Sequence, residues 1–275
     1  MTRHCGGSLF FTGRWLAVKI VSWNVNGIRA CAKKGFLSWL EEASPDVLLL
    51  QETKAWPDQL DAELLESHGY HCVWATAEKK GYSGVSTWSR QAPDDHQIGL
   101  GIERFDREGR TVITDHGRLR IFNGYFPNGQ RDHGRVPYKL DYYAAVLDAA
   151  ELARAEGRLV LISGDWNTAH REVDLARPKA NRKTTGFLPE ECAWMDRWFD
   201  AGYHDTFRVM HPDTTGAYSW WSFRSGARER NVGWRIDYHV VADELLPMVT
   251  SAGIEASVMG SDHCPVTVEL DDGRF

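Results

Sequence analysis

Short apolar runs recur along the chain and alternate with longer amphipathic segments. Residues 46–51 and 159–162 each contain a continuous apolar run, which is typical of a strand buried on both faces. Further strands are predicted from β-rich runs at residues 18–24, 84–89, 111–114, 119–126, 236–241 and 266–270. The chain therefore has strands distributed over its whole length.

Three segments have helical spacing instead. Residues 36–43 carry apolar side chains on one stripe, and so do residues 136–156. A third helix is predicted from Pro189 to Phe199, because proline is favourable in a first helical turn, where its missing N–H has no partner to lose.

The alternation of these elements predicts the fold class. No linker, low-complexity stretch or fixed-period repeat divides the chain, so we expect residues 18–275 to form a single catalytic domain. Mixed strands and helices predict an α/β protein, a four-layer α/β sandwich of two packed mixed β-sheets flanked by helices. Residues 1–17 are expected to be a disordered N-terminal extension.

Composition narrows the class of protein. The chain is 43% hydrophobic and 25% charged, as in an ordinary globular protein. No apolar run approaches the ~18 residues of a membrane span, and the patch at residues 8–11 is shorter than a signal-peptide core of ~7 residues. We therefore expect a cytoplasmic protein without a membrane partner, nucleoid-associated if bacterial. The five cysteines include no CxxC pair, which argues against a disulfide framework or a zinc site.

The net charge of −6 does not by itself favour a nucleic-acid partner. The charge is nevertheless uneven, because residues 171–183 and 224–235 are rich in arginine and lysine. Both clusters flank the candidate catalytic residues, which favours a role in binding over that of a solvated face.

Polar side chains follow several predicted strands. Asn24, Glu52, Asp165 and Asp237 each lie at or just beyond the end of an apolar run, and His263 lies in a loop before the last strand. One acid after a strand is usually a turn or cap residue, but a repeated arrival of oxygen ligands at strand ends is typical of a binding site in an α/β sheet. Such oxygens are the ligands that Mg²⁺ prefers.

Seven stretches, in this order, resemble the exonuclease III family of abasic-site endonucleases, within the endonuclease/exonuclease/phosphatase superfamily. Each is short, but the ordered set is specific and covers residue 18 to the C-terminus. The stretches are Ser22-Trp23-Asn24-Val25-Asn26-Gly27, Leu50-Gln51-Glu52-Thr53-Lys54, Gly81-Tyr82-Ser83-Gly84-Val85, Tyr125-Phe126-Pro127-Asn128, Gly164-Asp165-Trp166-Asn167, Asn231-Val232-Gly233-Trp234-Arg235-Ile236-Asp237-Tyr238 and Gly260-Ser261-Asp262-His263-Cys264-Pro265.

The resemblance implies a metal site and a catalytic set. Mg²⁺, with Mn²⁺ as a substitute, would be held by Glu52 with Asn24 and Asp262 beside it; whether one or two ions bind stays open. The implied catalytic residues are Asp165 and Asn167 for the attacking water, His263 with Asp237 as a phosphate-polarising dyad, and Tyr125 as a phosphate contact or leaving-group helper. Which group takes the proton also stays open.

A second implied set contacts DNA. The resemblance assigns a pocket for a baseless sugar to Trp220, Trp234 and Ile236. It assigns phosphate contacts to Arg29, Lys34, Tyr82, Asn128 and Asn181, and insertion into the duplex to Arg131 and Arg224, the latter at a position where some members carry an apolar wedge. In an extended strand Trp234 and Ile236 face away from Arg235 and Asp237, so either a twist or bulge turns Asp237 back or the two sets line adjoining sides.

The resemblance thus implies a monomeric DNA-repair nuclease. It would cut 5′ to an abasic site in duplex DNA and would also process 3′ ends, as a 3′→5′ exonuclease and 3′-phosphatase acting on blocked ends. Two alternatives remain: a superfamily member acting on RNA tails, phosphoinositides or sphingomyelin, and a DNA-binding protein that has lost catalysis. The intact catalytic positions argue against the second.

Overall fold

The computed structural model describes residues 17–65 and 67–271. The disordered extension predicted for residues 1–17 lies, apart from Ala17, outside the described residues. Within those ranges no helix is long and apolar enough to cross a membrane.

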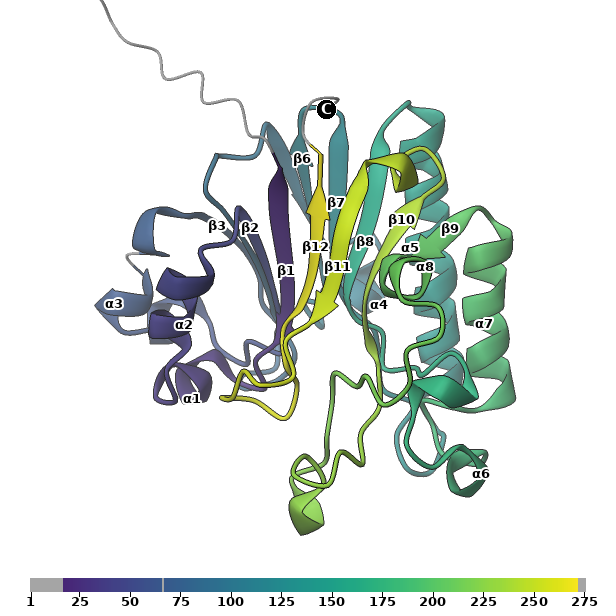
Figure 1. The fold of residues 1–275 in the computed structure, drawn as a ribbon. Helices are drawn as coiled ribbons and strands as arrows, with labels where there is room; N and C mark the ends of the chain where they lie inside the picture. Colours follow the sequence, from purple (N-terminus) through teal and green to yellow (C-terminus); the bar gives the residue numbers. More distant parts are fainter. Residues whose placement is uncertain (1–16, 66, 272–275) are drawn as a thin grey trace, which may run out of the picture.

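Two six-stranded sheets pack face to face, with helices on their outer faces (Figure 1). The first has the order β11-β12-β1-β2-β4-β3 and the second β5-β6-β7-β8-β10-β9. The first sheet consists of β1 (Val18–Asn24), β2 (Val47–Gln51), β3 (His71–Ala75), β4 (Val85–Ser89), β11 (Val249–Ile254) and β12 (Val266–Leu270). The second consists of β5 (Asp95–Ile98), β6 (Thr111–His116), β7 (Leu119–Tyr125), β8 (Leu159–Asp165), β9 (Tyr203–Asp205) and β10 (Asp237–Ala242). The predicted four-layer sandwich is confirmed.

The helices form the outer layers. On the first sheet lie α1 (Ile28–Ala32) and α2 (Phe36–Ala43), and on the second lie α5 (Val136–Ala155) and α7 (Pro189–Asp200) (Figure 1). Shorter helices occur in the connections: α3 (Ala62–Leu65), α4 (Glu103–Asp106), α6 (Pro178–Asn181) and α8 (Thr206–Met210).

Alternation along the central strands explains their continuous apolar runs. In β2, Leu48 and Leu50 pack under α1 and α2, whereas Leu49 belongs to the cluster between the sheets. In β8, Ile162 packs under α5 and α7 and Leu161 faces the inter-sheet cluster. Both faces of these strands are buried, so nearly every side chain is apolar.

Strand pairing brings polar ends together. Asn24 of β1 lies opposite Gln51 of the parallel strand β2. Asp165 of β8 lies opposite Tyr125 of the parallel strand β7 and opposite Asp237 of the antiparallel strand β10. The strand predicted to stop at Ile162 continues to Asp165, so one end of each sheet carries the candidate site.

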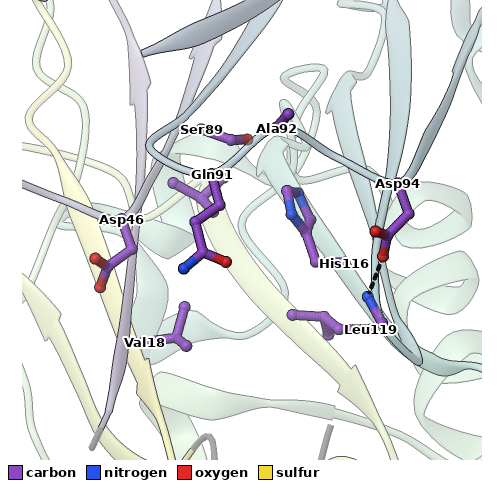
Figure 2. Close-up of a pocket in the computed structure, with 10 residues that line it drawn as sticks. Val18, Asp46, Ser89, Gln91, Ala92, Asp94, His116 and Leu119 are labelled. Carbon is purple, nitrogen blue, oxygen red and sulfur yellow. Dashed lines mark hydrogen bonds between the residues drawn. The ribbon is translucent and has the colours of Figure 1, made fainter. Parts of the chain in front are cut away.

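The opposite end of the sandwich contains a cavity of about 250 Å³. It opens between the two sheets near the start of β1 and is lined by Val18, Val47 and Leu119 together with Asp94 and His116 (Figure 2). None of the residues predicted to take part in catalysis, metal binding or DNA contact lines it.

Candidate active site

The layer between the two sheets changes from apolar to polar along each strand. In β1 every second residue reads Ile20, Ser22, Asn24, and Ile20 lies in the inter-sheet cluster. In β8 the same positions read Leu161, Ser163 and Asp165. The amide nitrogen of Asn24 donates to Oδ2 of Asp165 at 2.9 Å, joining the two sheets at their polar end. The period-2 alternation of two strands thus delivers the site.

Glu52 follows β2 directly and is held by three donors. Its Oε1 accepts from Asn24 Nδ2 at 3.0 Å and from the Tyr125 hydroxyl at 2.7 Å, and its Oε2 lies 2.6 Å from Lys54 Nζ. Burial alone would raise the pKa of Glu52, but the Lys54 ammonium and these hydrogen bonds lower it. Glu52 is therefore ionised. The Asn24 oxygen accepts from the Asn26 backbone N–H at 2.9 Å.

Asp165 is 1% exposed and lies deeper than Glu52. Its Oδ1 accepts from the backbone N–H of Asn167 at 2.8 Å. The pKa of Asp165 is raised by burial first and then by the neighbouring charges of Asp237 and Glu52. Asn167 has a left-handed backbone, with φ 53°, and donates to Phe126 O while accepting from Asn128.

His263 and Asp237 form the predicted pair. His263 Nδ1 lies 2.9 Å from Asp237 Oδ2, and His263 Nε2 lies 3.9 Å from Asp165 Oδ2. Burial would lower the pKa of His263, but the charge and hydrogen bond of Asp237 raise it well above its ordinary value. The imidazole is therefore protonated, with Nε2–H directed into the site.

A local irregularity explains how Asp237 reaches the site although Arg235 points away. Strand β10 begins only at Asp237, and the consecutive backbone N–H groups of Ile236 and Asp237 both donate to Ser219 Oγ, each at 3.1 Å. In a regular strand successive N–H groups point to opposite sides, so the chain is distorted here. The backbone is thus distorted at Ile236 and Asp237, and Asp237 reaches His263 from the first position of β10.

A possible metal site lies at the centre. One carboxylate oxygen each from Glu52 and Asp165 and a ring nitrogen of His263 lie within 4.8 Å of one another. The protonated imidazole has no lone pair to offer a metal, so the two carboxylates are the ligands in this group. Asp262 lies beside this group, where its carboxylate accepts from Asn26 Nδ2 at 2.9 Å and from Trp220 Nε1 at 3.0 Å. Burial opposes ionisation of Asp262, but His263 and these hydrogen bonds lower its pKa.

Two tryptophans pack on each other beside His263, with Trp220 the nearer. The rings of Trp220 and Trp234 meet edge to face, with centroids 6.4 Å apart, and the Trp220 and His263 centroids are also 6.4 Å apart. Ile236 is buried in the same apolar cluster as Phe187. The structure therefore brings the three residues assigned to the sugar pocket into one apolar cluster, of which Trp220 lies next to His263.

The residues assigned to DNA contacts are more dispersed. Asn128 contacts Asn167 directly, and Lys34 donates to Gly260 O at 3.2 Å, in the loop that precedes Asp262. Tyr82 accepts from Arg110 at 2.9 Å. Asn181 ends α6, and the remaining three side chains are exposed: Arg29 on α1, Arg131 in the turn before α5, and Arg224 in a short 3-10 turn (Arg224–Gly226).

The prediction for the second basic cluster, residues 224–235, is wrong in part. Within residues 224–235 we expected four arginines to flank the site as a binding surface. Arg235 is instead 1% exposed and pairs with Asp174 and Asp205. Arg228 is half-buried and donates to backbone carbonyls of Ser261, Ala256 and Val258. Only Arg224 and Arg230 of this cluster are exposed.

Two site residues were missed in the sequence. Lys54 neutralises Glu52, and its place in the Gln51-Glu52-Thr53-Lys54 motif was the available signal. Arg110 is 2% exposed, donates to Tyr125 O at 2.9 Å and lies with its guanidinium 4.7 Å from the Tyr125 ring centre. Nothing in its local sequence indicates this contact, because the partners come from different strands.

Comparison with known proteins agrees with this geometry. The profile described as the Endonuclease/Exonuclease/phosphatase family matches residues 21–263. An exodeoxyribonuclease of Bacillus subtilis (strain 168) is 45% identical over 255 residues, which cover 92% of this chain and 100% of that protein.

Two solved structures are similar as well. An AP endonuclease from Archaeoglobus fulgidus has a TM-score of 0.83 and 28% identity, covering 92% of this chain and 99% of that one. A 3′–5′ exonuclease, NExo, from Neisseria meningitidis has the same TM-score and identity, covering 92% and 100%. The resemblance inferred from the seven motifs is confirmed, and the chain belongs to the endonuclease/exonuclease/phosphatase family, in the branch of the exonuclease III and abasic-site endonucleases.

Proposed function

We propose that this nuclease hydrolyses the phosphodiester 5′ to an abasic site in duplex DNA, with Mg²⁺ as its metal and Mn²⁺ as a substitute. We extend the proposal to 3′→5′ exonuclease and 3′-phosphatase activity on blocked 3′ ends, since each reaction is attack of water on a phosphate ester. One observation carries the proposal: Glu52, Asp165 and His263 converge beside a wall of two tryptophans.

The donor set fits a hard divalent cation. Carboxylate oxygens of Glu52 and Asp165 lie within 4.8 Å of each other, and carboxylate oxygens are the usual Mg²⁺ ligands. The pKa of Asp165 is raised by burial and by Asp237 and Glu52, so this cluster has an excess of negative charge that a cation would relieve. Glu52 would be the main ligand, with Asn24 and Asp262 supporting it. Bound there, Mg²⁺ would neutralise phosphate charge.

Side chains of the protein would carry out the other steps of the reaction. His263 is held by Asp237 with its Nε2–H free to donate to a phosphate oxygen, which stabilises the charge that develops in the transition state. Asp165 would orient the attacking water, and its raised pKa suits it to accept the proton near neutrality. Asn167 would keep Asp165 in place through its backbone N–H. Tyr125, bonded to Glu52, would contact the phosphate or assist the leaving oxygen.

Selectivity would come from the pocket wall. Trp220, Trp234 and Ile236 would form an apolar wall for a baseless sugar, with Trp220 next to His263. A normal nucleotide loses its stacking when it is flipped out of the duplex, whereas an abasic one has little stacking to lose. Arg29, Lys34, Tyr82, Asn128 and Asn181 would hold phosphates, and Arg131 and Arg224 would enter the duplex.

We further propose that residues 18–275 act as one catalytic domain in a monomer. Such an enzyme would work where its DNA substrate is, in the cytoplasm and at the nucleoid if the cell is bacterial.

The experiment uses three substrates with one labelled strand: a duplex with a single abasic site, the matched intact duplex, and a single-stranded RNA of the same length. In Mg²⁺ we expect rapid incision of the abasic strand, leaving a 3′-hydroxyl and a 5′-deoxyribose phosphate. Slow shortening of the intact duplex from its 3′ end is also expected. Preferential cleavage of the RNA, or incision on the 3′ side of the abasic sugar, would contradict the proposal.

A further inference from the structure

A fully buried ion pair lies behind the catalytic residues. Lys139 of α5 and Glu191 of α7 are each 0% exposed, and Lys139 Nζ lies 2.6 Å from Glu191 Oε1. Removing two charges from water is costly, and apolar side chains of similar volume often serve stability as well. The role of the pair is therefore indicated by the contacts that Lys139 and Glu191 make with other residues.

The lysine end reaches a residue of the active site. Lys139 Nζ donates to the backbone carbonyl of Asn167 at 2.7 Å. Asn167 has a left-handed φ of 53°, a conformation that a non-glycine residue adopts at a cost, and its N–H is bonded to Asp165. Lys139 thus holds the carbonyl side of this strained turn, while Asp165 and Phe126 O hold its N–H and its side-chain amide.

The glutamate end holds the neighbouring loop. Its second oxygen, Oε2, accepts from the backbone N–H groups of Gly186 and Leu188. Gly186 packs closely between two site residues, because a Cβ added there would lie 3.1 Å from Asn167 O and 3.3 Å from the Trp234 ring. Glu191 therefore fixes a loop that lies against both the catalytic turn and the pocket wall.

We propose that Lys139 and Glu191 are a positioning pair for the active site. Lys139 orients Asn167, and through its backbone N–H the carboxylate of Asp165, while Glu191 keeps the ammonium in place and caps the loop behind Trp234. This inference rests on the proposed function, which assigns Asp165 and Asn167 to the attacking water.

Two variants separate positioning from stability. Glu191→Gln removes the buried negative charge but keeps an amine that donates to Asn167. The double variant Lys139→Met with Glu191→Gln removes both charges, so no buried charge is left unpaired, but it deprives Asn167 of its donor. Asp115→Asn with Arg120→Met is a matched control, because it neutralises an ion pair of 2.7 Å at the opposite end of the sandwich.

The measurements are Tm, the Kd for an abasic duplex, and the single-turnover cleavage rate at a temperature where all variants are folded. We expect Glu191→Gln to lower Tm and to slow cleavage, but by less than the double variant does, because the Lys139 amine that donates to Asn167 is kept. The double variant should cleave about tenfold more slowly with an unchanged Kd, since small misplacements of reacting groups reduce rates by such factors. The control pair should change neither the rate nor the Kd.

Amide hydrogen exchange of residues 165–170 gives a readout that needs no substrate. Exchange there should be faster in the double variant than in Glu191→Gln. A double variant that cleaves at the wild-type rate with wild-type exchange would overturn the positioning role, as would rates that simply follow Tm. A wild-type protein that leaves the abasic duplex intact contradicts the proposed function instead, and the exchange comparison then still decides the role of Lys139.

Discussion

The strands β1, β2 and β8 run through both ends of the sandwich and carry different side chains at each. At the site end β1 finishes in Asn24 and β8 in Asp165, and Glu52 follows β2. The Asn24 amide donates to both carboxylates and so joins the two sheets. At the far end the inter-sheet layer is apolar around Ile20 and Leu161 and opens into a cavity of about 250 Å³ (Figure 2).

The far cavity also has acids and a histidine, yet they are arranged differently. Asp94 accepts from the Gly117 backbone N–H at 2.7 Å, as a turn residue does, and Asp46 accepts from the Lys19 backbone N–H at 2.8 Å. At the site end, in contrast, the carboxylates converge on one point and their pKa values move in opposite directions. Hollow space alone therefore does not identify the functional end, whereas convergent titratable groups do.

The largest expected effect is on catalysis at the site end. Asp165→Asn and His263→Ala should each lower turnover by about 10² or more, the scale of lost proton transfer or charge stabilisation. DNA binding should survive, because phosphate contacts supply most of the affinity. Steady-state kinetics with an abasic duplex, beside a binding titration, measure both. Near-normal turnover of either variant would remove that residue from the mechanism.

The next effect is on stability and comes from a histidine between the two ends. His239 is buried, with Nδ1 2.8 Å from Ser163 Oγ and Nε2 3.0 Å from Val266 O, and burial lowers its pKa to about 4. Below pH 6.5 the imidazole of His239 becomes protonated in the unfolded chain but stays neutral in the folded protein. The free energy of unfolding therefore falls as the pH drops towards 4, by about 2 kcal/mol at pH 5.

Denaturant unfolding at pH 7 and pH 5 tests this, with His239→Gln as the comparison. The raised pKa of Asp165 contributes in the opposite sense, and the difference between the two proteins removes that contribution. Wild type should lose more stability on acidification than His239→Gln. Equal losses in both proteins would show that His239 is not the group responsible.

A smaller effect is expected at the pocket wall. Trp234→Ala removes a large side chain that packs on Trp220 and so opens space in the proposed pocket for a base-bearing nucleotide. The ratio of abasic to intact cleavage should therefore fall about tenfold, as for a lost apolar wall. The salt dependence of DNA binding should stay the same, because the phosphate contacts remain. An unchanged ratio with lowered stability would make Trp234 a core residue only.

The smallest effect is expected at the far end. Asp94→Asn repeats the chemical change of Asp165→Asn in the other cavity, and cleavage should stay within about twofold of wild type, as for an ordinary surface substitution. A tenfold or greater loss of cleavage rate would show that the far end of the sandwich also contributes to catalysis.

Most of the central fold could be predicted because its signal is local. All eight predicted strands and all three predicted helices occur, with ends shifted by up to three residues. The four strands that were missed are β3, β5, β9 and β11, and these are the four sheet edges. Edge strands are partly exposed and so lack continuous apolar runs; all four residues of β5 are exposed.

The site could be predicted where a motif coincides with a strand end, as at Glu52 and Asp165, whereas His263 was indicated by its motif alone. Contacts between distant segments left no such trace. The sequence around Lys139 is that of an ordinary helix. The proposed positioning role of Lys139 depends on the backbone carbonyl of Asn167, 28 residues away. Arg235 was counted as a surface charge because it was grouped with Arg224, Arg228 and Arg230, although the fold buries it against Asp174 and Asp205.

In the proposed mechanism, the carboxylates at the site end use a divalent metal to cleave DNA. The direct measurement follows incision of a single abasic duplex first in excess EDTA and then after Mg²⁺ is added beyond the chelator. We predict that incision stops in EDTA and returns with Mg²⁺ in wild type, while Glu52→Gln needs a higher Mg²⁺ concentration for half-maximal rate. Full incision in EDTA, or a Mg²⁺ requirement unchanged by Glu52→Gln, would contradict the account.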